Sequence, residues 1–431
     1  MERHVLGRFT AVGRRTLLQA AVAIAVLAGS FAGQSVHADE DTSGRRWVST
    51  WAASPMQPGT AFAPSRSFEN QTIRQIVHAS IGGSKVRVRL SNQYGPGDLL
   101  VGAAHVALMS SGDTIVPASD RALTFNGQTT ISIPLGAVAV SDPVNLVVAN
   151  NGDIAISLYV PQNTGDATFH HNAVQTAYIS AAGDFTASVD FPTAETRPQN
   201  FWLSFVEVIP STRDEIGAMA VFGDAFTEGS STTRDANHRP TNYVSAAVNP
   251  TGGPTRLGVI NQATACGRLL FLVCGPSGVS RFERDVLNAP GISHVVMAIG
   301  NVDLFLPNYT GDTSEEVSAD QVIAGIHELA QRARARGLVV FGATFTPIEL
   351  SGPDFYTPEY EEKRQAVNAW IRTTSDFDAV VDFDAAVRDP NRPAALLPEY
   401  AYVDGLHLSD AGSAVQGQVI VDVLRQTGVL P

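Results

Sequence analysis

The order of hydrophobic and polar residues divides the chain into two halves. Between residues 47 and 210 apolar and polar positions alternate, most strictly at 85–90, which reads Lys-Val-Arg-Val-Arg-Leu. Such alternation is typical of a half-buried strand. Segments 145–148 and 154–159 predict further strands, and Gly-, Asn- and Pro-containing turns separate them. We find no convincing helical pattern here, so residues 47–210 predict an all-β sandwich or jelly-roll domain.

The pattern changes between residues 215 and 431. Short apolar runs predict buried strands, and helical patterns separate several of them. Ser318 with Gln321 has the form of a capping box, Thr357-Pro358 predicts a second helix start, and Ser409 predicts a third. This alternation predicts an α/β domain: a doubly wound parallel sheet whose site lies at the carboxyl ends of its strands. The predicted strands lie at 219–222, 257–260, 295–299, 338–341 and 380–383.

The first 38 residues have the pattern of an export signal peptide. Four arginines precede an apolar stretch at 17–28, and Val36-His37-Ala38 has the small-x-small form of a cleavage site. The apolar stretch is shorter than the roughly 20 residues that span a bilayer. We therefore expect an exported protein, extracellular or periplasmic, without a stable membrane span. Removal of residues 1–38 would change the net charge from −13 to −16.

Composition narrows the choice of partners. A net charge of −13 argues against nucleic-acid binding, which needs a basic surface. The sequence has no zinc-type or phosphate-loop motif, so we expect no metal and no cofactor. His170 and His171 are adjacent, and we interpret them as strand or loop residues rather than metal ligands. A small-molecule, acyl-ester or glycan ligand remains as the expected partner, and the oligomeric state stays open.

Three segments contain residues that could take part in catalysis, and two of these segments directly follow predicted strands. Strand 219–222 leads into Gly-Asp-Ala at 223–225, and strand 295–299 leads into Gly-Asn-Val-Asp at 300–303. Close to the C-terminus, Asp404 precedes His407 by three residues. One local turn can then bring the carboxylate against the imidazole, where it would orient the ring and stabilise its protonated form. Asp303, Asp382 and Asp384 also follow strand ends, where carboxylates are mostly solvated.

Several motifs resemble the SGNH, or GDSL-type, ester hydrolases, and specifically a secreted two-domain branch of that family. The resemblance implies hydrolysis of acyl esters on lipids, acetylated sugars or small molecules, with Asp404 and His407 as the intact part of a catalytic triad. It extends over nearly the whole of the chain after residue 38. It rests on segments 47–52, 72–78, 275–287 and 342–347 and on the terminal Asp-x-x-His.

The departures from the family pattern concern the catalytic residues. Where the resemblance places the nucleophilic serine, the chain has Ala225. Cys266 stands at the oxyanion glycine position, and Val302 replaces the oxyanion asparagine. Loss of the nucleophile costs on the order of 10⁶ in turnover, and loss of one oxyanion donor on the order of 10²–10³. We therefore expect serine-type ester hydrolysis to be nearly absent. The residues expected to line this degenerate site are Asp224, Ala225, Cys266, Gly267, Asn301 and Val302.

Three hypotheses follow from these departures. His407, oriented by Asp404, can serve as a base for cyclisation, elimination or isomerisation without a covalent intermediate. The chain can instead be a noncatalytic carbohydrate- or lipid-binding protein. The third hypothesis is a residual hydrolase that uses Cys266 as its nucleophile. Two cysteines eight residues apart in an exported protein more often form a disulfide, so we favour a Cys266–Cys274 bond.

Overall fold

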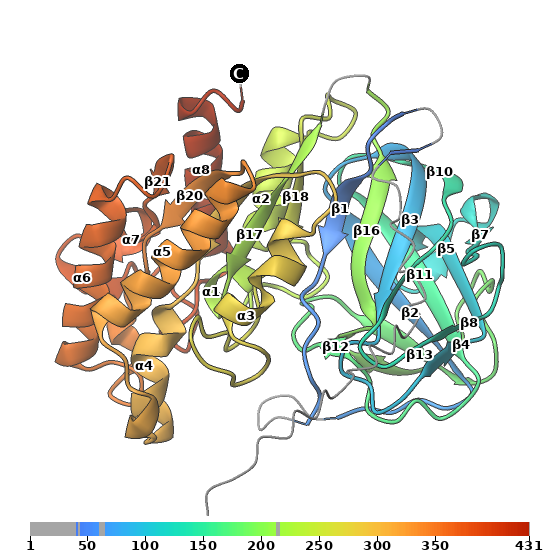
Figure 1. Ribbon diagram of the computed structural model, residues 1–431, viewed down its shortest axis with the longest axis horizontal. Coiled ribbons are helices and arrows are strands. Elements are labelled where there is room, and N and C mark those ends of the chain that lie inside the picture. Colours follow the sequence, from blue (N-terminus) through green and yellow to red (C-terminus); the bar gives the residue numbers. More distant parts are fainter. Residues whose placement is uncertain (1–39, 42–43, 60–64, 213–215, 431) are drawn as a thin grey trace, which may run out of the picture. The chain divides into compact units, whose positions relative to one another are not determined.

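The computed structural model describes residues 40–41, 44–59, 65–212 and 216–430 (Figure 1). The expected export signal at 1–38 lies outside the described residues. Asp39–Pro431 form one compact unit, so both halves of the sequence pattern belong to the same folded body. The division into domains at 47–210 and 215–431 stays a prediction.

The first half of this body consists of antiparallel strands. One sheet has the order β1-β16-β3-β10, with β9 also on β3, and another has the order β14-β13-β2-β11-β5-β6, with β7 on β5. Alternate residues from both sheets share one hydrophobic core, which is why the strands read as alternating sequences. The strands are β1 (Val48–Ala52), β2 (Gln71–Ala79), β3 (Gly83–Ser91), β4 (Leu99–Val101), β5 (Ala103–Ser111), β6 (Thr114–Ile115), β7 (Arg121–Ala122), β8 (Ile131–Ile133), β9 (Val138–Val140), β10 (Val144–Val148), β11 (Gly152–Val160), β12 (Phe169–His170), β13 (Ala177–Ala182), β14 (Thr193–Arg197), β15 (Asn200–Phe201) and β16 (Leu203–Ile209).

Strand β3 corrects one detail of the sequence interpretation. The predicted strand is present, and its apolar residues face the core, but its polar side is largely buried as well. Arg87 and Arg89 both form ion pairs with the fully buried Glu207 of the neighbouring strand β16. A buried charge is tolerated where opposite charges and hydrogen bonds compensate for lost water. The alternation therefore predicted the strand, whereas Glu207 on the neighbouring strand allows the polar side of β3 to be buried.

The second half contains the predicted parallel sheet, and this prediction is confirmed. Its order is β18-β17-β19-β20-β21, and every neighbouring pair is parallel. Each predicted apolar run overlaps one of these strands, because both faces of the sheet are covered. The strands are β17 (Gly217–Gly223), β18 (Leu257–Asn261), β19 (Ile292–Ala298), β20 (Val339–Ala343) and β21 (Ala379–Val381), and a small hairpin pairs β22 (Arg388–Asp389) with β23 (Arg392–Leu396).

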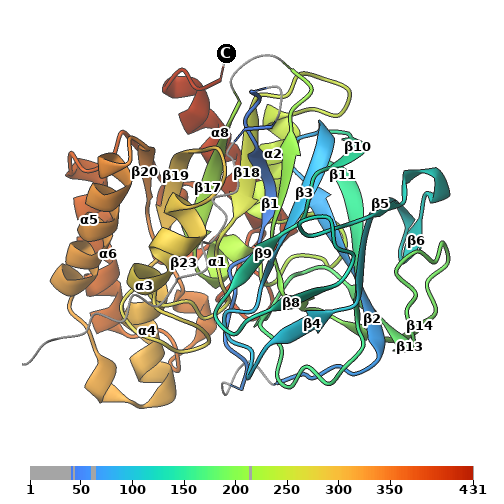
Figure 2. The ribbon, with the colours of Figure 1, turned by 45° about the vertical axis from the view of Figure 1, so that its right-hand side comes forward.

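Helices cover both faces of the parallel sheet (Figures 1 and 2). Apolar residues of α3, α4, α5 and α6 pack on one face, and those of α2, α7 and α8 on the other. The predicted starts are confirmed: Ser318 and Gln321 form the capping box of α5, Thr357 caps α6, and Ser409 caps α8. The helices are α1 (Ala225–Glu228), α2 (Pro240–Val248), α3 (Gly278–Phe282), α4 (Asn301–Thr310), α5 (Ala319–Ala335), α6 (Pro358–Thr373), α7 (Phe383–Val387) and α8 (Asp410–Gln426).

The strand order creates a position for a binding site. From β17 the chain passes to β18 on one side of the sheet and returns to β19 on the other. The segments that follow β17 and β19 therefore diverge and leave a crevice at the carboxyl edge, where ligands of such sheets bind. The antiparallel half approaches the same sheet, since β1 lies beside β18 (Figure 2) and the backbone N–H of Ser49 donates to Pro290.

Candidate functional site

Helix α1 begins directly at the carboxyl end of β17. Asp224 is its N-cap and accepts a hydrogen bond from the backbone N–H of Phe226 at 3.2 Å. Ala225 is the first helical residue and is 7% exposed. Its side chain is a methyl group, so the first turn of α1 presents backbone N–H groups but no side-chain oxygen at this position. Three of these N–H groups, those of Phe226, Thr227 and Glu228, bond to Asp224, and the Ala225 methyl group cannot attack a carbonyl.

Asp404 and His407 lie together in the segment that precedes α8. The His407 Nδ1 is 2.7 Å from the Asp404 Oδ2, and Asp404 Oδ1 accepts the backbone N–H groups of Leu406 and His407 at 2.9 Å each. Because a carboxylate only accepts, Nδ1 carries the proton and Nε2 is left as the basic nitrogen. The His407 ring lies 5.6 Å from the ring of Phe226, the second residue of α1.

The electrostatics of Asp404 fit a group that stays ionised. Burial by itself raises the pKa of a carboxyl group. The hydrogen bond from the His407 ring, with those from two backbone N–H groups, outweighs burial and holds the pKa of Asp404 at about 2. Asp404 is therefore a carboxylate at neutral pH and is suited to orient an imidazole.

A histidine–carboxylate pair is common in this molecule, so the pair alone does not mark a site. Among the described histidines, six contact an Asp or Glu side chain within ion-pair distance. His327 and Asp376, for example, are also 2.7 Å apart but lie on α5 and the segment after α6. His407 lies beside the first turn of α1, at the carboxyl edge of the sheet, whereas the His170–Glu228 pair lies at the other end of this helix and the remaining four pairs do not involve α1.

Residues 221–415 match the family described as GDSL-like lipase/acylhydrolase. This part of the chain is a GDSL-like lipase/acylhydrolase domain. Solved structures similar to the chain include a GDSL-like lipase from Bacteroides thetaiotaomicron (20% identity, 48% of this chain and 88% of that chain, TM-score 0.37) and a lipase/acylhydrolase from Enterococcus faecalis (16% identity, 49% and 96%, TM-score 0.37). A carbohydrate acetylesterase from Sinorhizobium meliloti is 14% identical (49% and 99%, TM-score 0.38). No curated protein sequence matches significantly.

Two segments lie at the carboxyl edge of the sheet: residues 262–274, after β18, are called the second block, and residues 300–303, after β19, are called the third block. The second block contains a disulfide. Cys266 and Cys274 are bonded, as the sequence favours, and no free cysteine is present among the described residues. Cys266 has φ of +47°, a backbone conformation that glycine adopts readily and other residues rarely. Gly267 completes this turn by donating its N–H to Thr264. The disulfide removes the thiolate that a nucleophilic Cys266 would need.

The third block forms the start of α4. Asn301 and Val302 are its first residues, and both are buried. The amide of Asn301 is held by two partners: its oxygen accepts from the Tyr360 hydroxyl at 2.8 Å, and its nitrogen donates to the Thr346 carbonyl at 3.4 Å. Val302 belongs to an apolar cluster of the sheet face. Neither side chain is therefore an unengaged hydrogen-bond donor for an oxyanion.

Asp303 corrects the expectation of solvated carboxylates. It is fully buried and accepts the backbone N–H groups of Leu269 at 2.6 Å and Leu270 at 3.0 Å, which fixes the second block against α4. Burial raises its pKa to about 6 despite these hydrogen bonds. Asp384 is buried too, because Arg364 and two further arginines pair with it. Asp303 therefore holds backbone of the second block, whereas the Asp384 carboxylate holds three arginine side chains.

A small cavity of about 10 Å³ lies beside the start of α1, and its lining includes Asp224, Asn301, Thr346 and Gln416. Asp224 Oδ2, Thr346 Oγ1 and both amide atoms of Gln416 are buried and have no hydrogen-bond partner among the described residues. Burial raises the pKa of Asp224 to about 8, and the nearby Asp303 adds to this effect against the hydrogen bond from Phe226. Asp224 thus retains its proton at neutral pH.

Sequence reasoning missed one group that organises the site. Glu228, at the end of α1, is buried; its Oε1 accepts the N–H of Ala265 at 2.7 Å and contacts His170 Nε2 at 3.1 Å. His170 Nδ1 in turn lies 3.0 Å from the Ser54 carbonyl. Glu228 therefore joins α1, the second block and the antiparallel half. The sequence carries no signal for this contact, since 58 residues separate His170 from Glu228.

In the described part of the chain, two features that would indicate particular partners are absent. None of its helices is long and apolar enough to cross a membrane. No group of three or more His, Cys, Asp or Glu side chains within it could hold a metal ion.

Proposed function

We propose that the GDSL-like domain acts as a base catalyst rather than as a serine hydrolase, with His407 as the base and Asp404 as the residue that orients it. The observation that carries this proposal is the hydrogen-bonded Asp404–His407 pair beside α1, in which Nε2 is the nitrogen left to accept a proton. A substrate C–H or O–H proton would pass to Nε2 and return to a leaving or rearranged atom. Cyclisation, elimination and isomerisation of a small-molecule or acyl substrate fit this chemistry.

The degenerate positions support this choice over ester hydrolysis. Ala225 offers no nucleophilic oxygen, Val302 offers no hydrogen-bond donor, and Cys266 is held in a disulfide. Hydrolysis through an acyl-enzyme therefore lacks its first step. Proton abstraction needs only a positioned base and a site that orients the substrate.

The test compares two histidines with matching partners. Candidate esters, lactones and acylated sugars are incubated with the wild type, His407→Ala and His327→Ala, and products are followed by mass spectrometry. We expect conversion by the wild type and by His327→Ala, and a loss of about 10²–10⁴ in His407→Ala. Equal conversion in all three proteins would contradict the proposal. Binding of a panel compound that is unchanged in His407→Ala, without any conversion, would favour the noncatalytic alternative.

We also propose that the protein is exported after removal of residues 1–38 and that residues 47–210 and 215–431 are its two domains. The basic n-region, the apolar stretch and the small-x-small site support export. N-terminal sequencing of protein from the medium or periplasm should begin at Asp39. Retention of the full chain in the cytoplasm would contradict this.

A further inference from the structure

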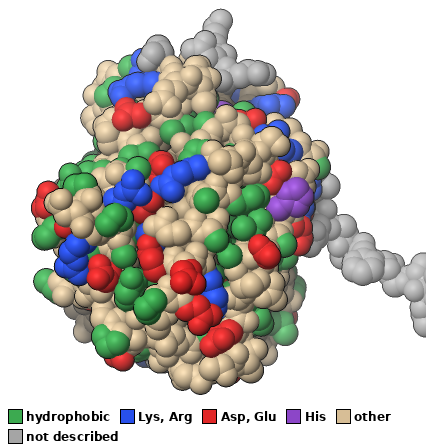
Figure 3. Space-filling view, turned by 90° about the vertical axis from the view of Figure 1, so that its left-hand side faces the viewer, with side chains coloured by type: hydrophobic (Ala, Val, Ile, Leu, Met, Phe, Trp, Pro, Cys, Tyr) green, Lys and Arg blue, Asp and Glu red, His purple; other side chains and the backbone are tan. Residues whose placement is uncertain are grey.

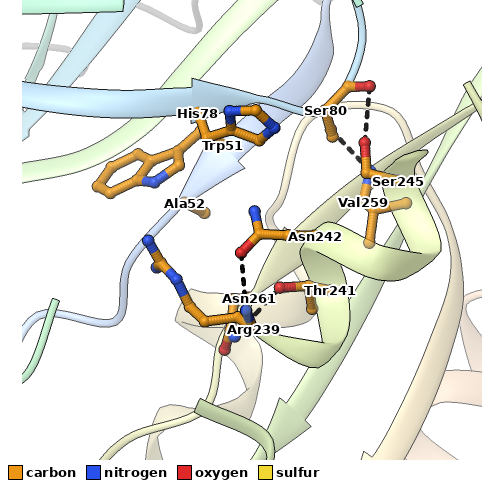
Figure 4. Close-up of a pocket in the computed structure, with 10 residues that line it drawn as sticks. All are labelled: Trp51, Ala52, His78, Ser80, Arg239, Thr241, Asn242, Ser245, Val259 and Asn261. Atoms are coloured by element: carbon orange, nitrogen blue, oxygen red, sulfur yellow. Dashed lines mark hydrogen bonds between the residues drawn. The ribbon is translucent and has the colours of Figure 1, made fainter. Parts of the chain in front are cut away.

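A second polar pocket lies where the antiparallel half meets the GDSL-like domain (Figure 4). It has a volume of about 20 Å³, room for one or two water-sized groups. Strands β1 and β2 supply Trp51 and His78, and the start of α2 supplies Arg239, Thr241 and Asn242. The pocket is separate from the Asp404–His407 pair, and no step of the proposed function uses it.

Arg239 is partly buried, and its partners differ from those of the deeply buried arginines of this protein. Arg281 and Arg364 each form an ion pair with an aspartate. Within the described residues, Arg239 has no carboxylate at ion-pair distance, and its guanidinium hydrogen bond goes to the neutral side chain of Gln175 at 3.3 Å. Figure 4 shows the side chain extending toward Trp51. A cation with unused N–H groups therefore faces the pocket.

The neighbouring side chains also present donors. Asn242 accepts the Arg239 backbone N–H with its oxygen, so its NH₂ group is turned into the pocket toward His78 (Figure 4). Thr241 accepts from Asn261, which leaves its hydroxyl proton free to donate. The indole N–H of Trp51 can only donate. His78 is the exception, because its Nδ1 donates to Asp153 and leaves Nε2 as an acceptor in the neutral ring. Arg239, Asn242, Thr241 and Trp51 offer donors, one of them cationic, and such a set fits an anion.

Three carboxylates influence Arg239 from outside the pocket lining. Burial lowers its pKa to about 10, while Glu228, Asp235 and Asp153 oppose that fall, so Arg239 stays cationic at neutral pH. Each of these carboxylates has its own hydrogen-bond partners in the structure. These carboxylates repel an anion at longer range, so the affinity for an anion must come from direct hydrogen bonds to the pocket.

We propose that this pocket binds a small anion, a halide or a single carboxylate group, between Arg239 and Asn242. Asn261, which also lines the pocket, donates to the Thr227 carbonyl at 3.0 Å, in α1. A bound anion would thus add hydrogen bonds across the contact between the two halves and beside the helix that begins at Ala225.

The test measures thermal unfolding in sodium chloride and in sodium formate, with ionic strength held constant by a bulky sulfonate buffer salt. We expect a saturable rise in Tm for the wild type and for the surface control Arg334→Gln. Asn242→Asp keeps the acceptor for the Arg239 N–H but removes the donor and adds a negative charge, so it should abolish the saturable rise. Arg239→Gln should weaken binding about tenfold or more.

Crystals grown in bromide provide a direct readout, an anomalous peak between Arg239 and Asn242. A stronger response to formate than to chloride identifies a carboxylate as the preferred group, and the reverse identifies a halide. Glucuronate then shows whether a carboxylate carried by a sugar is accepted. A linear, unsaturable change in Tm that is equal in the wild type and Asn242→Asp, together with no anomalous peak, would overturn the proposal.

Discussion

At the scale of single residues, the proposal of base catalysis depends on one methyl group, the side chain of Ala225. Ala225 occupies the first turn of α1, where the resemblance places a serine, and the pair that would activate that serine is hydrogen-bonded nearby. The sequence predicted both the missing oxygen and the Asp404–His407 contact. It did not predict that Asn301 is engaged by Tyr360, because that contact spans 59 residues.

Replacing Ala225 by serine tests how much of an acyl-transfer site remains. We expect Ala225→Ser to gain fluorophosphonate labelling and measurable hydrolysis of p-nitrophenyl acetate, because His407 could then activate the hydroxyl. The gain should stay limited, and Val302→Asn added to it should raise turnover by about 10²–10³. Removal of His407 from the double variant is the control. Hydrolysis that persists without His407 would show that the new serine is not activated by this pair.

Asp224 gives a pH-dependent prediction. Its pKa is about 8 in the folded protein and about 3.9 in an unfolded chain. The folded state therefore holds this proton more tightly, and its contribution to stability is largest below pH 4 and declines as the pH rises toward 8.

Asp224→Asn keeps the N-cap and removes this titration, so the variant should gain stability relative to the wild type between pH 5 and pH 8. The slope is at most about 1.4 kcal/mol per pH unit. Urea denaturation at the two pH values measures it. Parallel changes in both proteins would contradict a raised pKa.

At the scale of elements, the caps and the second block show local sequence directing local structure. Ser318, Thr357 and Ser409 begin helices as predicted, because capping depends on atoms within one turn. The second block forms a turn in which Cys266 has positive φ and is cross-linked to Cys274.

Two double variants separate the contribution of the disulfide to stability from that of the backbone conformation at Cys266. Cys266→Ser with Cys274→Ser should lose roughly 2–3 kcal/mol of unfolding free energy, since the short loop regains entropy when unfolded. Cys266→Gly with Cys274→Ser should lose about 1 kcal/mol less, because glycine adopts the positive φ without strain. Both are compared with the oxidised wild type in urea, and the reduced wild type is the control that lacks only the cross-link. Equal stabilities of the two variants would argue against strain at residue 266.

At the scale of the whole molecule, buried charges connect the two halves. Ser54 donates to Asp285 at 2.5 Å, and Arg284 reaches Asp285, the Ser54 hydroxyl and Tyr94. Arg281 pairs with the same carboxylate and donates to the carbonyls of Gly223 and Gln262, next to the start of α1. On the molecular face shown in Figure 3, by contrast, charged side chains of both signs lie at the surface, interspersed with scattered hydrophobic side chains.

Asp285→Asn tests this connection. It removes a negative charge that the buried Arg281 and the partly buried Arg284 share, so we expect a loss of about 3 kcal/mol or more. Asp422→Asn, in an exposed pair with Arg425, is the matched control and should change stability by less than about 1 kcal/mol. Calorimetry should show one cooperative transition for the wild type. Two separate transitions would mean that the halves unfold independently.

The sequence by itself determined the strand and helix types, the helix starts, the disulfide, the resemblance and the alanine at the position where the resemblance places a serine. These features depend on residues near one another in the chain or on residue identity alone. The tertiary structure decided which polar groups are buried: Arg87 against Glu207, Asp303 under the second block, and Glu228 against His170. It also brought β1, β2 and α2 together around the anion pocket. The physical reason is that a buried charge needs a partner, and folding brings these partners from distant segments of the chain.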